Sequence, residues 1–229
     1  MISLETLYRS AGFITGTLLH PSEITLLRQG SDHLHQTAAT MTRTDGDFNL
    51  EAAGGGYRGQ QIEVSSIAGV LRKVSNVIDH SPAAAQIADR RDLRQLAATL
   101  TGAGHRGVTL AHSILWCKPP GVGSAKPPHA DAAYLEGKPD DYVTFWIALD
   151  DCDTENGCLQ VIPTSHLHDY EHVSDEPQVP DTLWQSLSRM DVLLHPGWAI
   201  AFHPRLLHAS AANTSTRPRR ALMLRYQAW

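Results

Sequence analysis

An imidazole and a carboxylate stand two residues apart, at His129 and Asp131, in a stretch that otherwise has the composition of turns and strands. Alternate residues of a strand face the same side, so these two groups can converge if the stretch is extended. Such a pair can supply two ligands of a metal site, which then needs a third ligand from elsewhere in the chain. The alternative is a solvated surface pair with no chemical role, because a short motif of this kind is weak support for a site.

The other histidines are the candidates for the third ligand. His203 and His208 flank the letters PRLL, next to a predicted strand, and either one could bring an imidazole back beside His129 and Asp131. Two further histidine pairs have same-face spacing and are expected to be solvated: His33 with His35, and His166 with His168.

Size and charge limit the class of protein. The chain has 229 residues, 42% hydrophobic, with a formal net charge of −5, which suits one large domain with its own core. It has no basic excess to neutralise phosphates, which argues against nucleic acid as a partner. The three cysteines form no C-x-x-C motif, so a reducing, cytoplasmic setting is favoured over a disulfide framework. The N-terminal residues resemble neither a signal peptide nor a membrane span.

The first third of the chain is expected to be largely helical. Residues 3–41 are predicted to form a short helix, a turn and a second helix that begins near Pro21 and Ser22, with Ser22 as its N-cap. The polar, glycine-rich residues 42–64 are predicted to form a loop that runs into a strand. Residues 75–102 have helical periodicity.

Beyond residue 106 the hydrophobic period changes to two. Short segments rich in β-formers are separated by Gly, Pro, Asn or Asp: GVTLAHSILWCK, YVTFWIALDD, GCLQVIP, WAIAFH and RRALMLRYQ. Helices followed by a run of strands predict a mainly β protein with flanking N-terminal helices, rather than an alternating α/β sheet. We expect one domain that spans residues 1–229.

Several ordered motifs carry a family resemblance. They are KPPG at 118–121, HAD at 129–131, WIALDDCDTENGCLQVIPTSH at 146–166, PGWAIAFHPRLLHAS at 196–210 and NTSTRPRRALMLRY at 213–226. Together they resemble the phytanoyl-CoA dioxygenase family of Fe(II)/2-oxoglutarate oxygenases. The resemblance implies a double-stranded β-helix (jelly-roll, cupin-like) core over 107–229, with 1–106 as a mostly helical support and lid. Thr164 stands where the family usually has glycine in its PGSH turn.

The resemblance also implies a ligand set. His129 and Asp131 match the family's His-x-Asp, and His208 matches its distal histidine, which implies a facial triad for Fe(II) with 2-oxoglutarate and O2 as co-substrates. A closed zinc site would favour four ligands, usually with cysteine, and no cysteine lies within ten residues of these three in sequence. A catalytic zinc held by two histidines and an acid stays open.

One arginine should bind the far carboxylate of 2-oxoglutarate, since a guanidinium matches a carboxylate bidentately. Family spacing places this arginine eleven residues after His208, at Arg219, and implies an assisting hydroxyl at Ser210. Neighbours Arg217 and Arg220 are then expected to be solvated. Successive strand residues point to opposite faces, so Arg219 and Arg220 cannot both reach the same cavity.

The predicted strand at 142–151 should have one core face and one cavity face. Val143, Phe145, Ile147 and Leu149 form the expected core face. We assign Thr144 and Trp146, on the other face, to the cavity that holds co-substrate and substrate; simple core packing is the alternative for Trp146. Family members often have a polar co-substrate contact near the position of His112, on the preceding predicted strand.

Two further residues are expected to contact the substrate. Tyr134 lies just after the metal carboxylate; a tyrosine with no specific contact is the alternative. In the glycine-rich segment, Tyr57 or Arg58 is expected to close over the site as part of a lid, because glycine-rich loops of this length are often functional. An inert connector is the alternative.

These features favour an enzyme. We expect an Fe(II)/2-oxoglutarate dioxygenase that hydroxylates a free small molecule and releases succinate and CO2, with desaturation, epoxidation or cyclisation as variants. A halogenase on this scaffold would have Gly or Ala in place of Asp131. A non-catalytic cupin-like binding protein would be expected to lack a complete triad. The chain has no nucleotide-binding signature, which disfavours a large acyl-CoA substrate.

Overall fold

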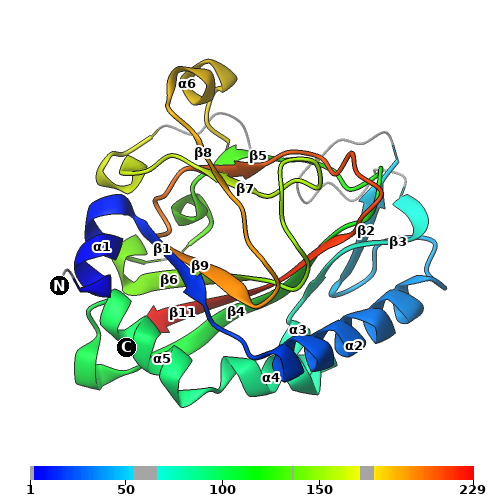
Figure 1. Cartoon of the computed structure of the whole chain (residues 1–229), viewed down its shortest axis with the longest axis horizontal. Helices are drawn as coiled ribbons and strands as arrows, with labels where there is room; N and C mark the ends of the chain where they lie inside the picture. The colour runs from blue at the N-terminus through cyan, green and yellow to red at the C-terminus, as the bar shows by residue number, and fades with distance from the viewer. Residues whose placement is uncertain (1–2, 54–65, 136, 171–177) are drawn as a thin grey trace.

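The fold is a sandwich of antiparallel sheets, in a computed structural model that describes residues 3–53, 66–135, 137–170 and 178–229 (Figure 1). Within these ranges the strands form a seven-stranded sheet, in the order β1-β9-β6-β11-β4-β3-β2, and a four-stranded sheet, in the order β5-β10-β7-β8. The strands are β1 (Phe13–Thr17), β2 (Phe48–Ala52), β3 (Ser66–Ser75), β4 (Val108–Lys118), β5 (Lys126–His129), β6 (Tyr142–Ala148), β7 (Leu159–Val161), β8 (Met190–Val192), β9 (Trp198–Phe202), β10 (His208–Ser210) and β11 (Arg219–Ala228).

Helices cover the outer face of the large sheet. They are α1 (Leu4–Ala11), α2 (Pro21–Ala38), α3 (Val77–His80), α4 (Pro82–Ala88) and α5 (Arg91–Leu100). A further helix, α6 (Asp181–Ser186), lies apart from these. Figure 1 shows α2 to α5 along one side of the large sheet and the small sheet on the other. None of the helices in the described ranges is both long and apolar enough to cross a membrane.

Strand alternation divides the apolar residues into two main cores. The outward side chains of β6, including Phe145 and Ile147, pack with the helices, whereas Trp146 and Ala148 pack between the two sheets. Leu222 and Met223 of β11 divide in the same way. The expected core face of the 142–151 segment is therefore confirmed, and the fold class is confirmed as well.

Two details of the N-terminal prediction are wrong. The expected turn between the first two helices contains strand β1, which pairs with β9 and places Phe13 opposite Phe202. Helix α2 is capped by His20, not Ser22, because Pro21 occupies the first helical turn, where its missing N–H costs nothing. The Glu23 carboxylate accepts a hydrogen bond from the His20 backbone N–H at 2.8 Å.

Residues before 107 also contribute strands, so the sheets are not confined to the C-terminal part of the chain. Strands β2 and β3 extend the large sheet beyond β4. The helical stretch predicted at 75–102 is divided into α3, α4 and α5, with Ser81 as the N-cap of α4 and Pro82 as its first residue. The segment with Tyr57 and Arg58, which we expected to form a lid, lies outside the described residues.

Candidate metal and co-substrate site

Strand pairing brings three candidate ligands together. His129 ends β5, Asp131 begins a short 3-10 turn at Asp131–Tyr134, and His208 begins β10. Strands β5 and β10 are antiparallel, with His208 directly opposite His129. The three side chains are buried, and one potential ligand atom from each lies within 4.8 Å of the others. His203, the other candidate for the third ligand, lies 3.3 Å from Asp140 instead.

Backbone hydrogen bonds prepare both imidazoles for a metal. Nδ1 of His129 lies 2.8 Å from the Pro127 carbonyl oxygen, and Nδ1 of His208 lies 2.9 Å from that of Leu206. A carbonyl can only accept, so each Nδ1 carries the proton and each Nε2 keeps its lone pair. These Nε2 atoms lie 3.6 and 3.9 Å from Oδ1 of Asp131. The arrangement leaves three lone-pair donors on one side of a common point.

The electrostatic environment keeps these donors in their metal-binding forms. Burial lowers the pKa of His129 to about 3, and burial also lowers the pKa of His208. Burial alone would raise the pKa of Asp131, but the Arg225 guanidinium holds it well below its ordinary value. Near neutral pH both imidazoles are therefore neutral and the carboxylate is ionised.

Arg225 fixes the carboxylate from behind, a role that the sequence analysis did not assign. Its Nη2 donates to Oδ2 of Asp131, and its Nε donates to the Thr144 hydroxyl at 3.0 Å. Thr144 in turn donates to Oδ2 at 3.4 Å. The structure thus places Thr144 behind Asp131 rather than in the cavity wall where we expected it, and Oδ1 is left for a metal.

A cavity between the two sheets contains the three ligands and several of the predicted co-substrate residues. Trp146, Ser210 and Arg219 line it together with the triad. His112 is exposed and does not line it. Tyr134 is 45% exposed and also lies outside the wall, although its ring meets that of His129 edge-on. Arg58, the other predicted substrate contact, lies outside the described residues.

Arg219 is a buried cation for which the described residues supply no counter-ion. It is 3% exposed, its guanidinium lies 5.2 Å from the centre of the Trp146 ring, and its Nε has no hydrogen-bond partner. No carboxylate in the described part of the chain forms an ion pair with it. Removing a cation from water without a partner is costly, so this end of the cavity suits an anion.

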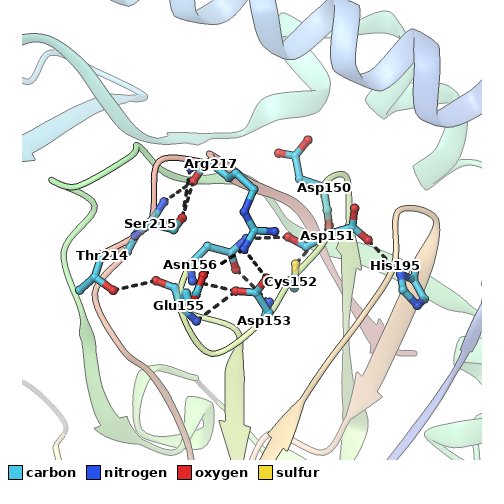
Figure 2. Close-up of polar contacts among 11 residues, drawn as sticks. Asp150, Asp151, Cys152, Asp153, Glu155, Asn156, His195, Thr214, Ser215 and Arg217 are labelled. Carbon is cyan, nitrogen blue, oxygen red and sulfur yellow. Dashed lines mark hydrogen bonds and ion pairs between the residues drawn. The ribbon is translucent and has the colours of Figure 1, made fainter.

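The two neighbouring arginines point away from the cavity: strand alternation turns Arg220 to the opposite face, and Arg217 lies in the loop before the strand. Arg220, which we expected to be solvated, is only partly exposed, and it forms an ion pair with Asp150 at 2.9 Å on the outer side of the sheet. Arg217 is an exposed loop residue whose Nη2 lies 2.6 Å from the Asp153 carboxylate (Figure 2). Of the three arginines, Arg219 is the one that lines the cavity.

Two smaller features differ from expectation or depart from the family pattern. His166, expected to be solvated, is buried, and its Nε2 lies 3.0 Å from the Arg9 carbonyl oxygen. Thr164, which stands where the family usually has glycine, adopts a φ of 67°. That region of backbone conformation strains a residue with a Cβ atom, so the missing glycine has a structural cost.

Comparisons with known proteins agree with this geometry. A family model described as phytanoyl-CoA dioxygenase (PhyH) matches residues 8–221. The chain belongs to this family. A relative named phytanoyl-CoA dioxygenase domain-containing protein 1 homolog, from Caenorhabditis briggsae, is 31% identical over 134 residues, covering 52% of this chain and 46% of the relative. The chain thus spans about half the length of the curated relatives it matches.

Solved structures share the whole fold. AviO1 from Streptomyces viridochromogenes Tue57 is 26% identical, with a TM-score of 0.75 over 96% of this chain and 91% of AviO1. The epimerase SnoN, solved in complex with Fe3+, alpha ketoglutarate and nogalamycin RO, is 22% identical, with a TM-score of 0.74 over 98% of this chain and 82% of SnoN. The resemblance to the phytanoyl-CoA dioxygenase family and the predicted fold are confirmed.

Proposed function

We propose that the protein is an Fe(II)/2-oxoglutarate-dependent dioxygenase that hydroxylates a free small molecule. In this reaction one atom of O2 enters the product as a hydroxyl group and the other enters succinate, while the first carboxyl carbon of 2-oxoglutarate leaves as CO2. The observation that carries the proposal is the combination, in one cavity, of a two-histidine, one-carboxylate cluster with the unpaired cation Arg219.

The donor set fits Fe(II). Two neutral imidazoles and one carboxylate on one side of an ion leave three positions open, which is the arrangement of non-haem Fe(II) oxygenases. Bound there, Fe(II) would supply the activation of O2. The chain's own part is to hold the tautomers of His129 and His208 through backbone carbonyls and to direct Oδ1 of Asp131 through Arg225.

The other end of the cavity fits the co-substrate. A keto acid that chelates the metal extends its far carboxylate away from it, and Arg219 offers that carboxylate a bidentate partner. Ser210, 5% exposed, lies two residues after His208 and lines the same cavity. Trp146 forms the wall beside the guanidinium. Binding of an anion here would remove the cost of burying Arg219 without a counter-ion.

Two alternatives are less well supported. A halide would need a vacant coordination position, which Asp131 fills. A non-catalytic binding protein has no need for a complete buried ligand cluster. Desaturation, epoxidation or cyclisation by the same residues is the second candidate reaction, and the epimerase SnoN shows that this fold supports an outcome other than hydroxylation.

A small-molecule substrate and a cytoplasmic location are part of this proposal. SnoN was solved with the small molecule nogalamycin RO. All three cysteines of this chain are free and buried, which is typical of proteins in reducing compartments.

The function is tested by anaerobic reconstitution. We expect one Fe(II) per chain and, on addition of 2-oxoglutarate, the weak visible absorption band of an iron–keto-acid chelate. The variant His208→Ala should lose both, because two ligands hold Fe(II) poorly, while His203→Ala, which removes an imidazole that lies against Asp140, should keep both. A folded His208→Ala variant with normal iron content, or a wild type without the band, would refute the proposal. Succinate formation in the presence of candidate small molecules would then identify the substrate.

A further inference from the structure

A second buried basic side chain lies beside Arg219, on the neighbouring strand. Lys118, the last residue of β4, lies directly opposite Arg219 in the register of β4 with β11. Both side chains line the cavity, and they are 5% and 3% exposed. If both were charged without an anion, they would destabilise the protein, because like charges opposite one another on paired strands repel and burial increases the cost. A pair of this kind is explained if an anion lies between the two side chains for part of the working cycle.

The local contacts of Lys118 hold its amine but do not neutralise it. Its Nζ donates to the backbone carbonyls of Ser210, at 3.4 Å, and Ala211. No carboxylate of the described residues accepts a hydrogen bond from it or forms an ion pair with it. When the amine is protonated it has three donors, so one donor then remains after these two carbonyls.

Close packing of two glycines limits the positions open to the Lys118 side chain. A Cβ atom on Gly123 would lie 2.7 Å from Cα of Lys118, and one on Gly157 would lie 3.1 Å from its Cδ. The stem therefore runs through a gap that only glycine leaves open. A lysine held in this way loses little conformational freedom when it binds a ligand.

We infer that Lys118 binds the far carboxylate of 2-oxoglutarate together with Arg219, and that this cation pair selects a dicarboxylate over a monocarboxylic keto acid. The inference rests on the function proposed above. Arg219 would supply the bidentate contact and Lys118 the single remaining N–H. The same contact would connect the co-substrate to the backbone of Ser210 and Ala211, just beyond the metal ligand His208.

Binding of a carboxylate beside Lys118 is expected to be coupled to proton uptake. Burial first, and then the charge of Arg219, lowers the pKa of Lys118 to about 6; Arg72 also lowers it, while Glu51 and Cys158 oppose the shift. In the free protein near neutral pH the amine is therefore mostly neutral. Its two hydrogens then suffice for the two backbone carbonyls of Ser210 and Ala211. An incoming carboxylate raises the pKa of Lys118, so binding takes up about one proton from solvent. Affinity for 2-oxoglutarate should accordingly weaken as the pH rises above about 6.

The test is anaerobic calorimetry of Fe(II)-loaded protein in two buffers of different ionisation enthalpy, which gives both affinity and proton uptake. We expect Lys118→Met to weaken 2-oxoglutarate binding about ten- to hundredfold and to abolish proton uptake. With 2-oxovalerate, which has the same chain length but no far carboxylate, wild type and variant should bind equally. The control Lys126→Met, which removes a cation from the same cavity wall, should retain the proton uptake.

The possible outcomes separate this inference from the proposed function. If the wild type binds no 2-oxoglutarate, the proposed function fails. If the wild type binds it without proton uptake, or if Lys118→Met weakens both ligands equally, the role of Lys118 fails while the function stands. The wild-type proton uptake can be measured even if the variant does not fold, so the inference can still be refuted in that case.

Discussion

The two faces of the large sheet are built from the same strands but have different roles: the outer face stabilises the fold, and the inner face holds the site. On the outer face, β4, β6 and β11 present apolar side chains such as Leu115, Phe145 and Leu224 to the helices. On the inner face the same strands present Lys118, Thr144, Arg219 and Arg225, all buried. Outer-face packing supplies stability, because burying apolar area is favourable. The inner face lowers stability with buried charges, and this difference identifies the inner face as the functional one.

The largest effect is expected from removing the charge at the centre of the inner face. The variant Asp131→Gly deletes a metal ligand and leaves Arg225 without its buried partner, so hydroxylation should fall by orders of magnitude. Succinate formation by the folded variant measures this loss. Asp150→Gly, which removes an ion pair on the outer side, should retain activity. A chlorinated compound as the main product of the wild type would contradict the assigned reaction.

The next largest effect is a loss of stability when a core side chain of the outer face is truncated. Phe145 is 1% exposed, so Phe145→Ala should lower the free energy of unfolding by about 3–5 kcal/mol, while the folded variant keeps its iron stoichiometry. Denaturant titration and metal analysis measure the two quantities. The neighbouring inner-face variant Trp146→Phe should show the reverse, with little loss of stability and weaker 2-oxoglutarate binding. If Phe145→Ala depleted iron as strongly as it lowered stability, the two faces would not be separable.

The smallest effect concerns backbone strain near the site. At Thr164, φ is 67°, and the left-handed region costs a residue with a Cβ atom about 1–2 kcal/mol. Thr164→Gly should therefore stabilise the protein by about 1 kcal/mol, once the greater freedom of glycine in the unfolded chain is subtracted. Thermal unfolding measures the change. Thr154→Gly, at an exposed residue without positive φ, is the control and should destabilise; a loss of stability at both positions would refute the strain argument.

Strand alternation made much of this comparison predictable from the sequence. The period of two located β4, β6, β7, β9 and β11, and it assigned Phe145 and Trp146 to opposite faces. The same alternation separates Arg219 from Arg220. The position of His208 came from the family resemblance, because its place opposite His129 depends on the pairing of β10 with β5, which short motifs do not specify.

Features that depend on contacts between distant segments were missed. Arg225 has a role only because β11 pairs with β6 and places it opposite Thr144. Lys118 belongs to the KPPG motif, but the significance of its charge appears only in its register with Arg219. Strand β1 is short, contains Gly16 and lies at the sheet edge, so its own sequence gives a weak β signal.

The most direct test of the account compares the adjacent arginines of β11, one on each face. Truncating one partner of a buried charge pair costs about 2–5 kcal/mol, and about 1.4 kcal/mol corresponds to tenfold in affinity. Anaerobic titration of the iron–keto-acid band should therefore show 2-oxoglutarate binding weakened roughly thirtyfold or more in Arg219→Ala. Arg220→Ala should bind it nearly as the wild type does, because Arg220 is paired with Asp150 outside the cavity. A large loss in Arg220→Ala with Arg219→Ala near normal would contradict the assignment of the two faces.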